Sequence, residues 1–166
     1  MTLVDSNVLL DIFTRTPGWW EWSLRQIEDA ALYGPLLIND VIYAETSIRF
    51  QNVDDFDKAL AEAGVTMMPI PRPALFLAGK AFIKYRDDGG TRAGVLPDLF
   101  IGAHAQVEQL PLLTRDTRRY RSYFPNVNLI APGAEQWCFS RTGASARHAR
   151  KKVCTNNLIS DTGGPS

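Results

Sequence analysis

The chain has 166 residues, which is enough for one domain with a buried core. Hydrophobic residues make up 45% of it and charged residues 22%, and this balance excludes an intrinsically disordered chain. The formal net charge is zero, so no overall basic field indicates a nucleic-acid partner.

The zero net charge hides an uneven distribution along the chain. Residues 138–166 carry five basic side chains and one acidic side chain, so the preceding part of the chain is acidic. From Ser140 onward the sequence is rich in Ser, Gly and Thr and has little hydrophobic periodicity. We therefore expect a folded domain over residues 1–137 and a basic, flexible tail over residues 138–166.

Three features of the sequence bear on the compartment. Cys138 and Cys154 form no metal-binding motif and are interpreted as free thiols of a reducing compartment, with a disulfide in the tail as the alternative. The N-terminal segment lacks the basic region and the cleavage site of a signal peptide. No apolar run approaches the roughly 20 residues that cross a bilayer. We expect a cytoplasmic protein that does not enter a membrane.

The predicted elements begin with a strand. Residues 2–4 are apolar and lead through Asp-Ser-Asn into a helix over residues 8–13. Thr16 and Pro17 are the residue types of an N-cap and a first helical turn, and they predict a second helix that runs to about Tyr33.

Strands and helices continue to alternate along the rest of the chain. A strand over residues 36–38 is followed by a helix that Asn39 or Asp40 caps and that runs to about residue 50. A helix over residues 54–63, ended by Gly64, leads to a strand over residues 65–70. Helices over residues 73–85 and 97–109, separated by a glycine-rich loop over residues 86–94, precede strands over residues 112–114 and 127–130. This alternation predicts a three-layer α/β/α fold with a short, mainly parallel central sheet of four or five strands.

Two aspartates follow predicted strands. Asp5 comes just after the first strand, and Asp116 comes just after the strand over residues 112–114. Ligands of an open parallel sheet bind outside the carboxyl ends of its strands, so these two carboxylates are expected to share one crevice. Each of them alone is equally well interpreted as a helix N-cap.

Two more acids lie on predicted helices. Glu45 shares a helix face with Val41 and Ile48, where a carboxylate needs a partner or a metal unless it reaches solvent at the edge of the face. Asp98 begins a helix of small and apolar residues, with an N-cap role as its alternative. Clustered carboxylates raise one another's pKa unless a cation neutralises them. Ligation by oxygen alone favours Mg²⁺, or Mn²⁺, over zinc.

Four segments resemble a known family in their order and spacing. LVDSNVLLDIF, NDVIYAE, VLPDLFIGAHA and LLTRD resemble the four acidic motifs of PIN-domain nucleases. The longer segment YRDDGGTRAGVLPDLFIGAHA is similar to the VapC toxins of bacterial toxin–antitoxin pairs. The resemblance covers residues 1–132 and implies a PIN-like fold. It also implies catalytic, metal-binding roles for Asp5, Glu45, Asp98 and Asp116, with Asn7 and Thr114 as supporting residues.

The same resemblance implies an activity and partners. The implied activity is Mg²⁺-dependent hydrolysis of RNA phosphodiester bonds by an endoribonuclease that acts as a toxin. The implied partners are a cognate antitoxin and a second copy of the chain in a homodimer. The ion would activate a water molecule and stabilise charge on the phosphorus without a general-base histidine. His104 and His148 are therefore interpreted as structural or solvated.

Two groups of side chains are candidate contact surfaces. Several arginines flank the predicted acids and are expected to contact RNA phosphates, although each alone is also typical of a solvated surface. They are Arg86, Arg92, Arg115, Arg118 and Arg119. Three tryptophans at the start of the second predicted helix cannot all face one core, so at least one is expected to be exposed, as a core rim or as an antitoxin surface. They are Trp19, Trp20 and Trp22.

Two alternative functions stay open. One is a non-catalytic PIN-fold module that binds RNA or protein, and the other is a housekeeping RNA-processing nuclease. A dehalogenase-like phosphatase is disfavoured because it needs an aspartate where this chain has Asn7.

Overall fold

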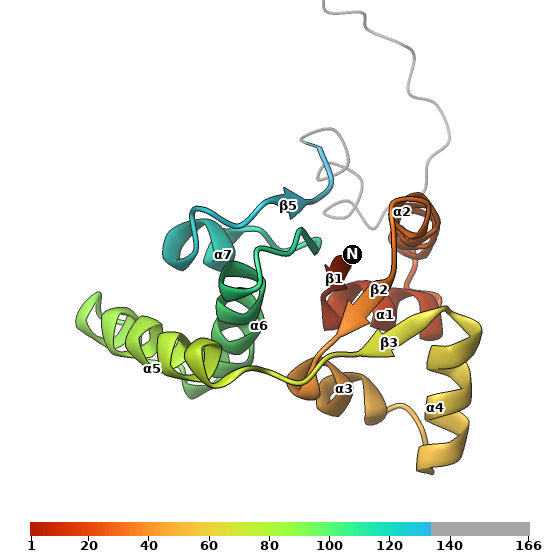
Figure 1. Cartoon of the computed structure of the whole chain (residues 1–166), viewed down its shortest axis with the longest axis horizontal. Coiled ribbons are helices and arrows are strands. Elements are labelled where there is room, and N and C mark those ends of the chain that lie inside the picture. The colour runs from red at the N-terminus through yellow and green to blue at the C-terminus, as the bar shows by residue number, and fades with distance from the viewer. Residues whose placement is uncertain (134–166) are drawn as a thin grey trace, which may run out of the picture.

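Five short strands form one parallel sheet at the centre of the molecule, in the order β3-β2-β1-β4-β5. The computed structural model describes residues 1–133 of the chain. The strands are β1 (Thr2–Val4), β2 (Leu36–Ile38), β3 (Val65–Met67), β4 (Leu112–Leu113) and β5 (Leu129–Ile130). This arrangement confirms the predicted α/β fold with a short parallel sheet (Figure 1).

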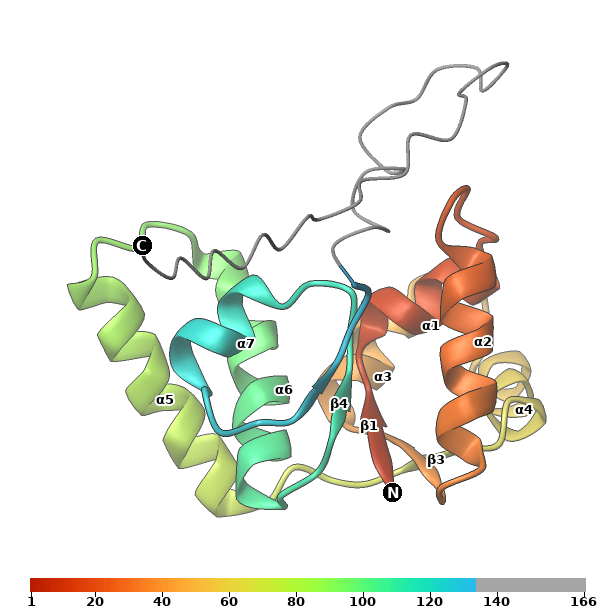
Figure 2. The ribbon, with the colours of Figure 1, turned by 90° about the horizontal axis from the view of Figure 1, so that it is seen from above.

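Helices cover both faces of the sheet. In Figure 2, α5 and α6 lie on one side of the strands, and α1 and α2 lie on the other. The helices are α1 (Ser6–Phe13), α2 (Trp20–Ala31), α3 (Asp40–Ser47), α4 (Val53–Glu62), α5 (Arg72–Asp87), α6 (Leu96–Val107) and α7 (Arg118–Tyr123), with one 3-10 turn, η1 (Ala93–Val95). A helix that could cross a membrane is not found in the described part of the chain.

The central strands are buried on both faces. Leu3, Val4, Leu112 and Leu113 have no exposed surface, as expected for a parallel sheet with helices on each side. At the edge of the sheet β3 keeps only Val65 buried. Since β1 and β4 are neighbours, whatever follows these two strands lies together at the carboxyl end of the sheet.

Several helix boundaries follow from local capping. The side chain of Asn39 accepts hydrogen bonds from the backbone N–H groups of Val41 and Ile42, so it caps α3 as predicted. Gly64 has a φ of +66° just after α4 and ends it, also as predicted. That helix begins at Val53 instead of Asp54, because the side chain of Asn52 caps it by accepting a hydrogen bond from the Asp55 backbone N–H.

Other boundaries were predicted wrongly. The second helix begins at Trp20 instead of Pro17, because Gly18 has a φ of +81° and breaks the helical path. Thr16 does not cap it through its side chain, since its hydroxyl pairs with that of Thr14 at 2.9 Å. Helix α3 ends at Ser47 and β3 at Met67, so both are shorter than predicted.

Helix α7 is an element that the sequence analysis missed. Its Tyr120 and the following Phe124 are buried, four residues apart on one side of the helix. The ring of Phe124 lies directly over Gly102 of α6, where a Cβ atom would come within 2.2 Å of it. Gly102 therefore allows α7 to approach α6 closely. The tail over residues 138–166, with Cys138, Cys154 and His148, lies outside the described residues.

Candidate active site

Asp5 is a buried carboxylate at the carboxyl end of β1. It occupies the N-cap position of α1, but its side chain makes no capping hydrogen bond, so the N-cap interpretation is wrong for it. Its Oδ2 instead accepts hydrogen bonds from the Thr114 hydroxyl at 2.6 Å, the Asn7 side-chain amide at 2.6 Å and the Tyr120 hydroxyl at 3.0 Å. Three donors on one oxygen hold the carboxylate in a single orientation.

Two of these donors depend on the pairing of β1 with β4. Thr114 follows β4 as Asp5 follows β1, so the parallel register sets them side by side. Asn7 also donates to the Thr114 hydroxyl at 3.1 Å and accepts from the Arg115 backbone N–H at 3.2 Å. The structure thus places both supporting residues named by the family resemblance in contact with Asp5.

Tyr120 is a site residue that sequence reasoning missed. Burial raises its pKa well above the usual range of a tyrosine, and the charges of Asp5, Glu45 and Asp116 add to this effect. Three of the four predicted acids thus act on one phenol hydroxyl. The signal for it was the spacing of Tyr120 and Phe124, which is that of a buried helix face.

Glu45 reaches the same place from α3. The Ser6 hydroxyl lies 2.7 Å from Glu45 Oε2 and 3.2 Å from Asp5 Oδ1, so one serine joins the two carboxylates. The predicted apolar face was partly wrong, because Ile48 lies past the end of the helix and is 72% exposed. The buried face runs through Ile42, and Glu45 borders it, half-buried.

Asp98 and Asp116 have different surroundings. Asp98 lies in the first turn of α6, whose N-cap is Val95, so the N-cap alternative is wrong for it. Its carboxylate forms an ion pair with the guanidinium of Arg119. Asp116 is exposed, and its Oδ1 accepts a hydrogen bond from the backbone N–H of Arg118 at 3.1 Å. The N-cap of α7 is Thr117, so the N-cap alternative is wrong for Asp116 too.

Burial makes the charged forms of Asp5 and Glu45 costly. Loss of solvent raises the pKa of Asp5, although its hydrogen bonds to Thr114, Tyr120 and Ser6 act in the opposite direction. Loss of solvent also raises the pKa of Glu45; the Ser6 hydrogen bond opposes this, and the nearby charge of Asp5 adds to it. Within residues 1–133 neither carboxylate forms a salt bridge. The charge of these two carboxylates is therefore not neutralised by a basic side chain of the described residues.

The four acids are not gathered into one coordination shell. Over the described residues, no three His, Cys, Asp or Glu side chains stand close enough together to hold a metal ion. Ser6 joins Asp5 to Glu45, and Thr114 joins Asp5 to Asp116 through the Asp116 backbone N–H, at 3.1 Å. Asp98 is paired with Arg119. A four-carboxylate metal site stays a prediction.

A family model for the PIN domain matches residues 2–125. The chain belongs to the PIN domain family. This confirms the resemblance found in the four acidic segments. No curated protein sequence matches the chain.

Solved structures similar to this PIN domain include toxin–antitoxin complexes. VapBC2 of Rickettsia felis, bound to a DNA fragment from its promoter, has a TM-score of 0.62 at 16% identity over 80% of this chain and 98% of that one. FitAcB of Neisseria gonorrhoeae has a TM-score of 0.56 at 18% identity over 78% and 96%. A toxin–antitoxin complex of Klebsiella pneumoniae has a TM-score of 0.53 at 21% identity over 76% and 95%. These likenesses show a shared fold.

The predicted RNA-contacting arginines of this PIN domain fall into two groups. Arg92, Arg118 and Arg119 line one pocket together with Asp116. Arg115 turns away from that pocket, because its guanidinium lies 3.1 Å from a carboxylate oxygen of the buried Asp11 and 5.3 Å from the centre of the Trp19 ring. Arg86, on α5, is exposed and does not line the pocket.

The three tryptophans and His104, which the sequence analysis also singled out, are buried or partly buried. Trp22 is buried, and Trp19 and Trp20 are partly buried, so none of the three is as exposed as predicted. His104 is fully buried on α6, with its Nδ1 at 3.2 Å from the Asn39 side-chain amide. That position agrees with the structural role expected for it.

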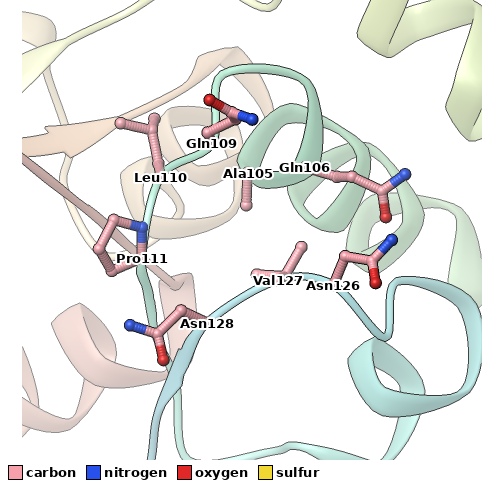
Figure 3. Close-up of a pocket in the computed structure, with 8 residues that line it drawn as sticks. All are labelled: Ala105, Gln106, Gln109, Leu110, Pro111, Asn126, Val127 and Asn128. Carbon is pink, nitrogen blue, oxygen red and sulfur yellow. The ribbon is translucent and has the colours of Figure 1, made fainter.

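A second pocket lies at the opposite end of the sheet of the PIN domain. It has a volume of about 360 Å³ and is formed where α6 ends and where β4 and β5 begin (Figure 3). Its polar side chains are the amides Gln106, Gln109, Asn126 and Asn128. None of its lining residues is charged or nucleophilic, so its chemistry differs from that of the acid end.

Proposed function

We propose that this protein is a Mg²⁺-dependent endoribonuclease that hydrolyses RNA phosphodiester bonds. The observation that carries the proposal is the pair of carboxylates of the buried Asp5 and the half-buried Glu45, joined by one serine at the carboxyl end of the sheet. Burying two acids this close together without a cation is unfavourable. Membership of the PIN domain family supports the same conclusion.

The residues present suit a hard divalent ion. Asp5 Oδ2 is occupied by three hydrogen-bond donors, whereas among residues 1–133 Oδ1 accepts a hydrogen bond from Ser6 alone, which leaves that oxygen for a cation. Asp5 and Glu45 would hold the ion, and Asp98 and Asp116 would join them as further oxygen ligands. Such a donor set suits Mg²⁺ or Mn²⁺. When bound, the ion would supply an activated water and neutralise charge on the phosphate.

The protein's own residues would orient this chemistry. Asn7, Thr114 and Tyr120 hold Asp5 in place through the hydrogen bonds on its Oδ2. Arg119 forms an ion pair with Asp98, and its guanidinium would be freed to contact a phosphate if an ion took its place on that carboxylate. No histidine is needed as a base in this scheme.

The test is cleavage of labelled RNA by the purified protein with Mg²⁺ and with EDTA. We expect EDTA, Asp5→Asn and Asp98→Asn each to lower the rate by at least about 100-fold, because even residues that only orient metal ligands affect affinity or activity by about 10–100-fold. Asp54→Asn, an exposed acid of α4, is the matched control and should cleave like the wild type. Cleavage that persists in EDTA contradicts the metal mechanism, and no cleavage by any form favours the non-catalytic binding module.

We further propose that the enzyme is the toxin of a toxin–antitoxin pair and acts in the cytoplasm. The support is its fold, which it shares with proteins solved as toxin–antitoxin complexes. Expression of the wild type alone should arrest growth, Asp5→Asn should not, and the product of an adjacent small gene should relieve the arrest. An enzyme that cleaves RNA in vitro but causes no arrest would be a housekeeping nuclease.

A homodimer is part of the same proposal. Helix α5 exposes Leu75, Phe76 and Ile83 on one side, at 44%, 68% and 53%. Apolar side chains gathered on one helix side favour contact with another protein surface. Light scattering should give a dimer mass for the wild type and a monomer mass for Phe76→Glu; a wild-type monomer at all concentrations excludes the dimer.

A further inference from the structure

Arg115 lies between two residues of the candidate site. It follows Thr114, whose hydroxyl donates a hydrogen bond to Asp5, and it precedes Asp116. Residues 114–116 come after the end of β4 and before the start of α7, so they belong to neither element. The side chain of Arg115 is 30% exposed. Its contacts differ from those expected of an arginine that clamps the RNA backbone.

The side chain of Arg115 is held against α1 and the start of α2. Its guanidinium lies 3.1 Å from Oδ1 of Asp11, a residue of α1 whose side chain is 1% exposed. The guanidinium also lies 5.3 Å from the centre of the Trp19 ring, a contact that stabilises a cation. The other carboxylate oxygen of Asp11 accepts a hydrogen bond from the Ser23 hydroxyl of α2 at 3.0 Å. Asp11 therefore links both helices to Arg115.

Arg115 balances the charge of this buried carboxylate. Oδ1 of Asp11 accepts no hydrogen bond from any of residues 1–133. Loss of solvent raises the pKa of Asp11, and the positive charge of Arg115 acts against this rise, as do hydrogen bonds from Ser23 and Thr16. A buried carboxylate without a partner is costly, so the ion pair favours a fixed position of the Arg115 side chain.

The backbone of Arg115 belongs to the hydrogen-bond network of Asp5. Its N–H donates to Asn7 Oδ1 at 3.2 Å, and the Asn7 amide donates to Asp5 at 2.6 Å. The next N–H, that of Asp116, donates to the Thr114 hydroxyl at 3.1 Å. Arg115 thus has its backbone on the acid site and its side chain on Asp11.

We infer that Asp11 and Arg115 are positioning residues, whose ion pair holds residues 114–116 in place beside Asp5. The inference rests on the proposed nuclease function, to which it adds two residues that act on metal ligands without touching the ion or the RNA. Because Asp116 lies outside the strands, the sheet does not fix it, and a side-chain anchor on the preceding residue supplies the missing constraint.

The first test is amide hydrogen exchange of the full chain in EDTA, which needs no activity. Asp11→Asn keeps the shape of the side chain and leaves Arg115 partly exposed, so this variant should fold. The amides of Arg115 and Asp116 should exchange roughly fivefold faster, which corresponds to the upper end for a partly exposed ion pair. The Leu112 amide, which donates within the sheet, should exchange at the wild-type rate. Asp54→Asn is the matched control.

The second test is the Mg²⁺ dependence of RNA cleavage. Asp11→Asn should raise the Mg²⁺ concentration for half-maximal cleavage by about tenfold, the lower end of the effect of residues that orient metal ligands. The KM for RNA at saturating Mg²⁺ should stay unchanged. Since Asp11 is buried and cannot contact RNA, this effect would act through Arg115.

Variants of Arg115 separate positioning from contact with RNA. Arg115→Gln should raise the Mg²⁺ requirement as Asp11→Asn does, and the double variant should raise it no further, because both changes remove the same ion pair. The double variant also leaves no unpaired buried charge, so it checks for loss of the fold. Arg115→Lys keeps the positive charge and should lie between the wild type and Arg115→Gln. Arg121→Gln, exposed on α7, is the matched control.

The salt dependence of RNA binding in EDTA completes the comparison. An arginine bound to phosphate contributes about 0.7 to the slope of log affinity against log salt for a single-stranded RNA. Arg115→Gln should keep the wild-type slope. A lower slope assigns Arg115 to the RNA and overturns the inference.

The outcome for the ion pair is distinguishable from that of the nuclease. Faster exchange of the Arg115 and Asp116 amides in Asp11→Asn, without any cleavage by the wild type, supports the positioning role and rejects the nuclease. Metal-dependent cleavage with an unchanged Mg²⁺ requirement in Asp11→Asn and Arg115→Gln supports the nuclease and rejects the inference. Unchanged exchange of both amides also rejects the inference.

Discussion

The two ends of the parallel sheet carry pockets of similar size and of different chemical character. The pocket at the amino ends, of about 360 Å³, is lined by amides and apolar side chains. The pocket at the carboxyl ends, of about 450 Å³, borders Asp116 and contains three arginines and two tyrosines. Beside it lie the buried Asp5 and the half-buried Glu45, and loss of solvent raises the pKa values of both carboxyl groups.

The two pockets differ in the charge of their side chains much more than in their volume, so the side chains distinguish the two ends of the sheet. Every strand of a parallel sheet points the same way, so the polar residues that follow the strands gather at one edge. At the amino ends of the strands, the residues that line the pocket are uncharged. The following predictions test this contrast, starting with the largest expected effect.

Removal of one hydrogen-bond donor to Asp5 should weaken Mg²⁺ binding at the carboxyl end of the sheet. Thr114→Val and Tyr120→Phe each delete one hydrogen bond to Asp5 Oδ2, so the Mg²⁺ concentration for half-maximal cleavage should rise by about 10–100-fold. The matched control is Tyr43→Phe, which deletes a hydrogen bond to the exposed Asp57 and should leave the Mg²⁺ requirement unchanged. An unchanged requirement for both site variants would mean that Asp5 is not a metal ligand.

Removal of the arginine that pairs with Asp98 should have a smaller effect, in the opposite direction. Arg119→Gln ends the competition between guanidinium and metal, and a partly exposed ion pair contributes roughly 0.2–1 kcal/mol. The Mg²⁺ dissociation constant, measured by calorimetry, should fall by about 1.4- to fivefold. Arg121→Gln, from the exposed side of the same helix, is the control. Weaker Mg²⁺ binding by Arg119→Gln would show that Arg119 assists the ion instead of competing with it.

The buried acids should make the metal-free protein less stable as the pH rises. The folded state raises the pKa of Asp5 above 3.8 and that of Glu45 above 4.5, so it binds protons more tightly than the unfolded chain. The resulting stability is fully present below those unfolded values and is lost as the pH rises through the folded-state pKa values.

Thermal unfolding in EDTA measures this contribution. The melting temperature should fall with rising pH in the wild type and fall less in Asp5→Asn, which should be the more stable protein at pH 7. Each kcal/mol gained corresponds to about 2–4 °C in a chain of this size. Asp54→Asn should follow the wild type. A steeper fall in Asp5→Asn would contradict the raised pKa of Asp5.

Substitutions at the amino end should have the smallest effect. Asn126→Ala and Gln109→Ala change exposed residues of the amide-lined pocket, and such changes alter stability by no more than about 0.5 kcal/mol. The cleavage rate should stay within about twofold of the wild type, because these side chains lie at the other end of the sheet from the acids. A loss comparable to that of Tyr120→Phe would remove the contrast between the two ends of the sheet.

The sequence by itself determined which residues stand at the carboxyl end and what the local boundaries are. Asp5 and Asp116 were placed after strands, the Asn39 cap and the Gly64 stop were identified, and the four acidic segments indicated the PIN domain. Each of these signals depends on residues only a few positions apart or on a motif read directly, so no knowledge of tertiary packing was needed.

Only the tertiary structure decided how the site is assembled. It joins Asp5 to Tyr120, 115 residues away, and it sets Tyr85 beside Tyr123 across α5 and α7. It also forms the ion pair between Asp98 and Arg119, which no local sequence pattern predicts. The physical reason is that these contacts follow from the order of strands in the sheet and from the close approach of α7 to α6. Hydrophobic periodicity and capping residues describe segments, and they carry no information on which segments become neighbours.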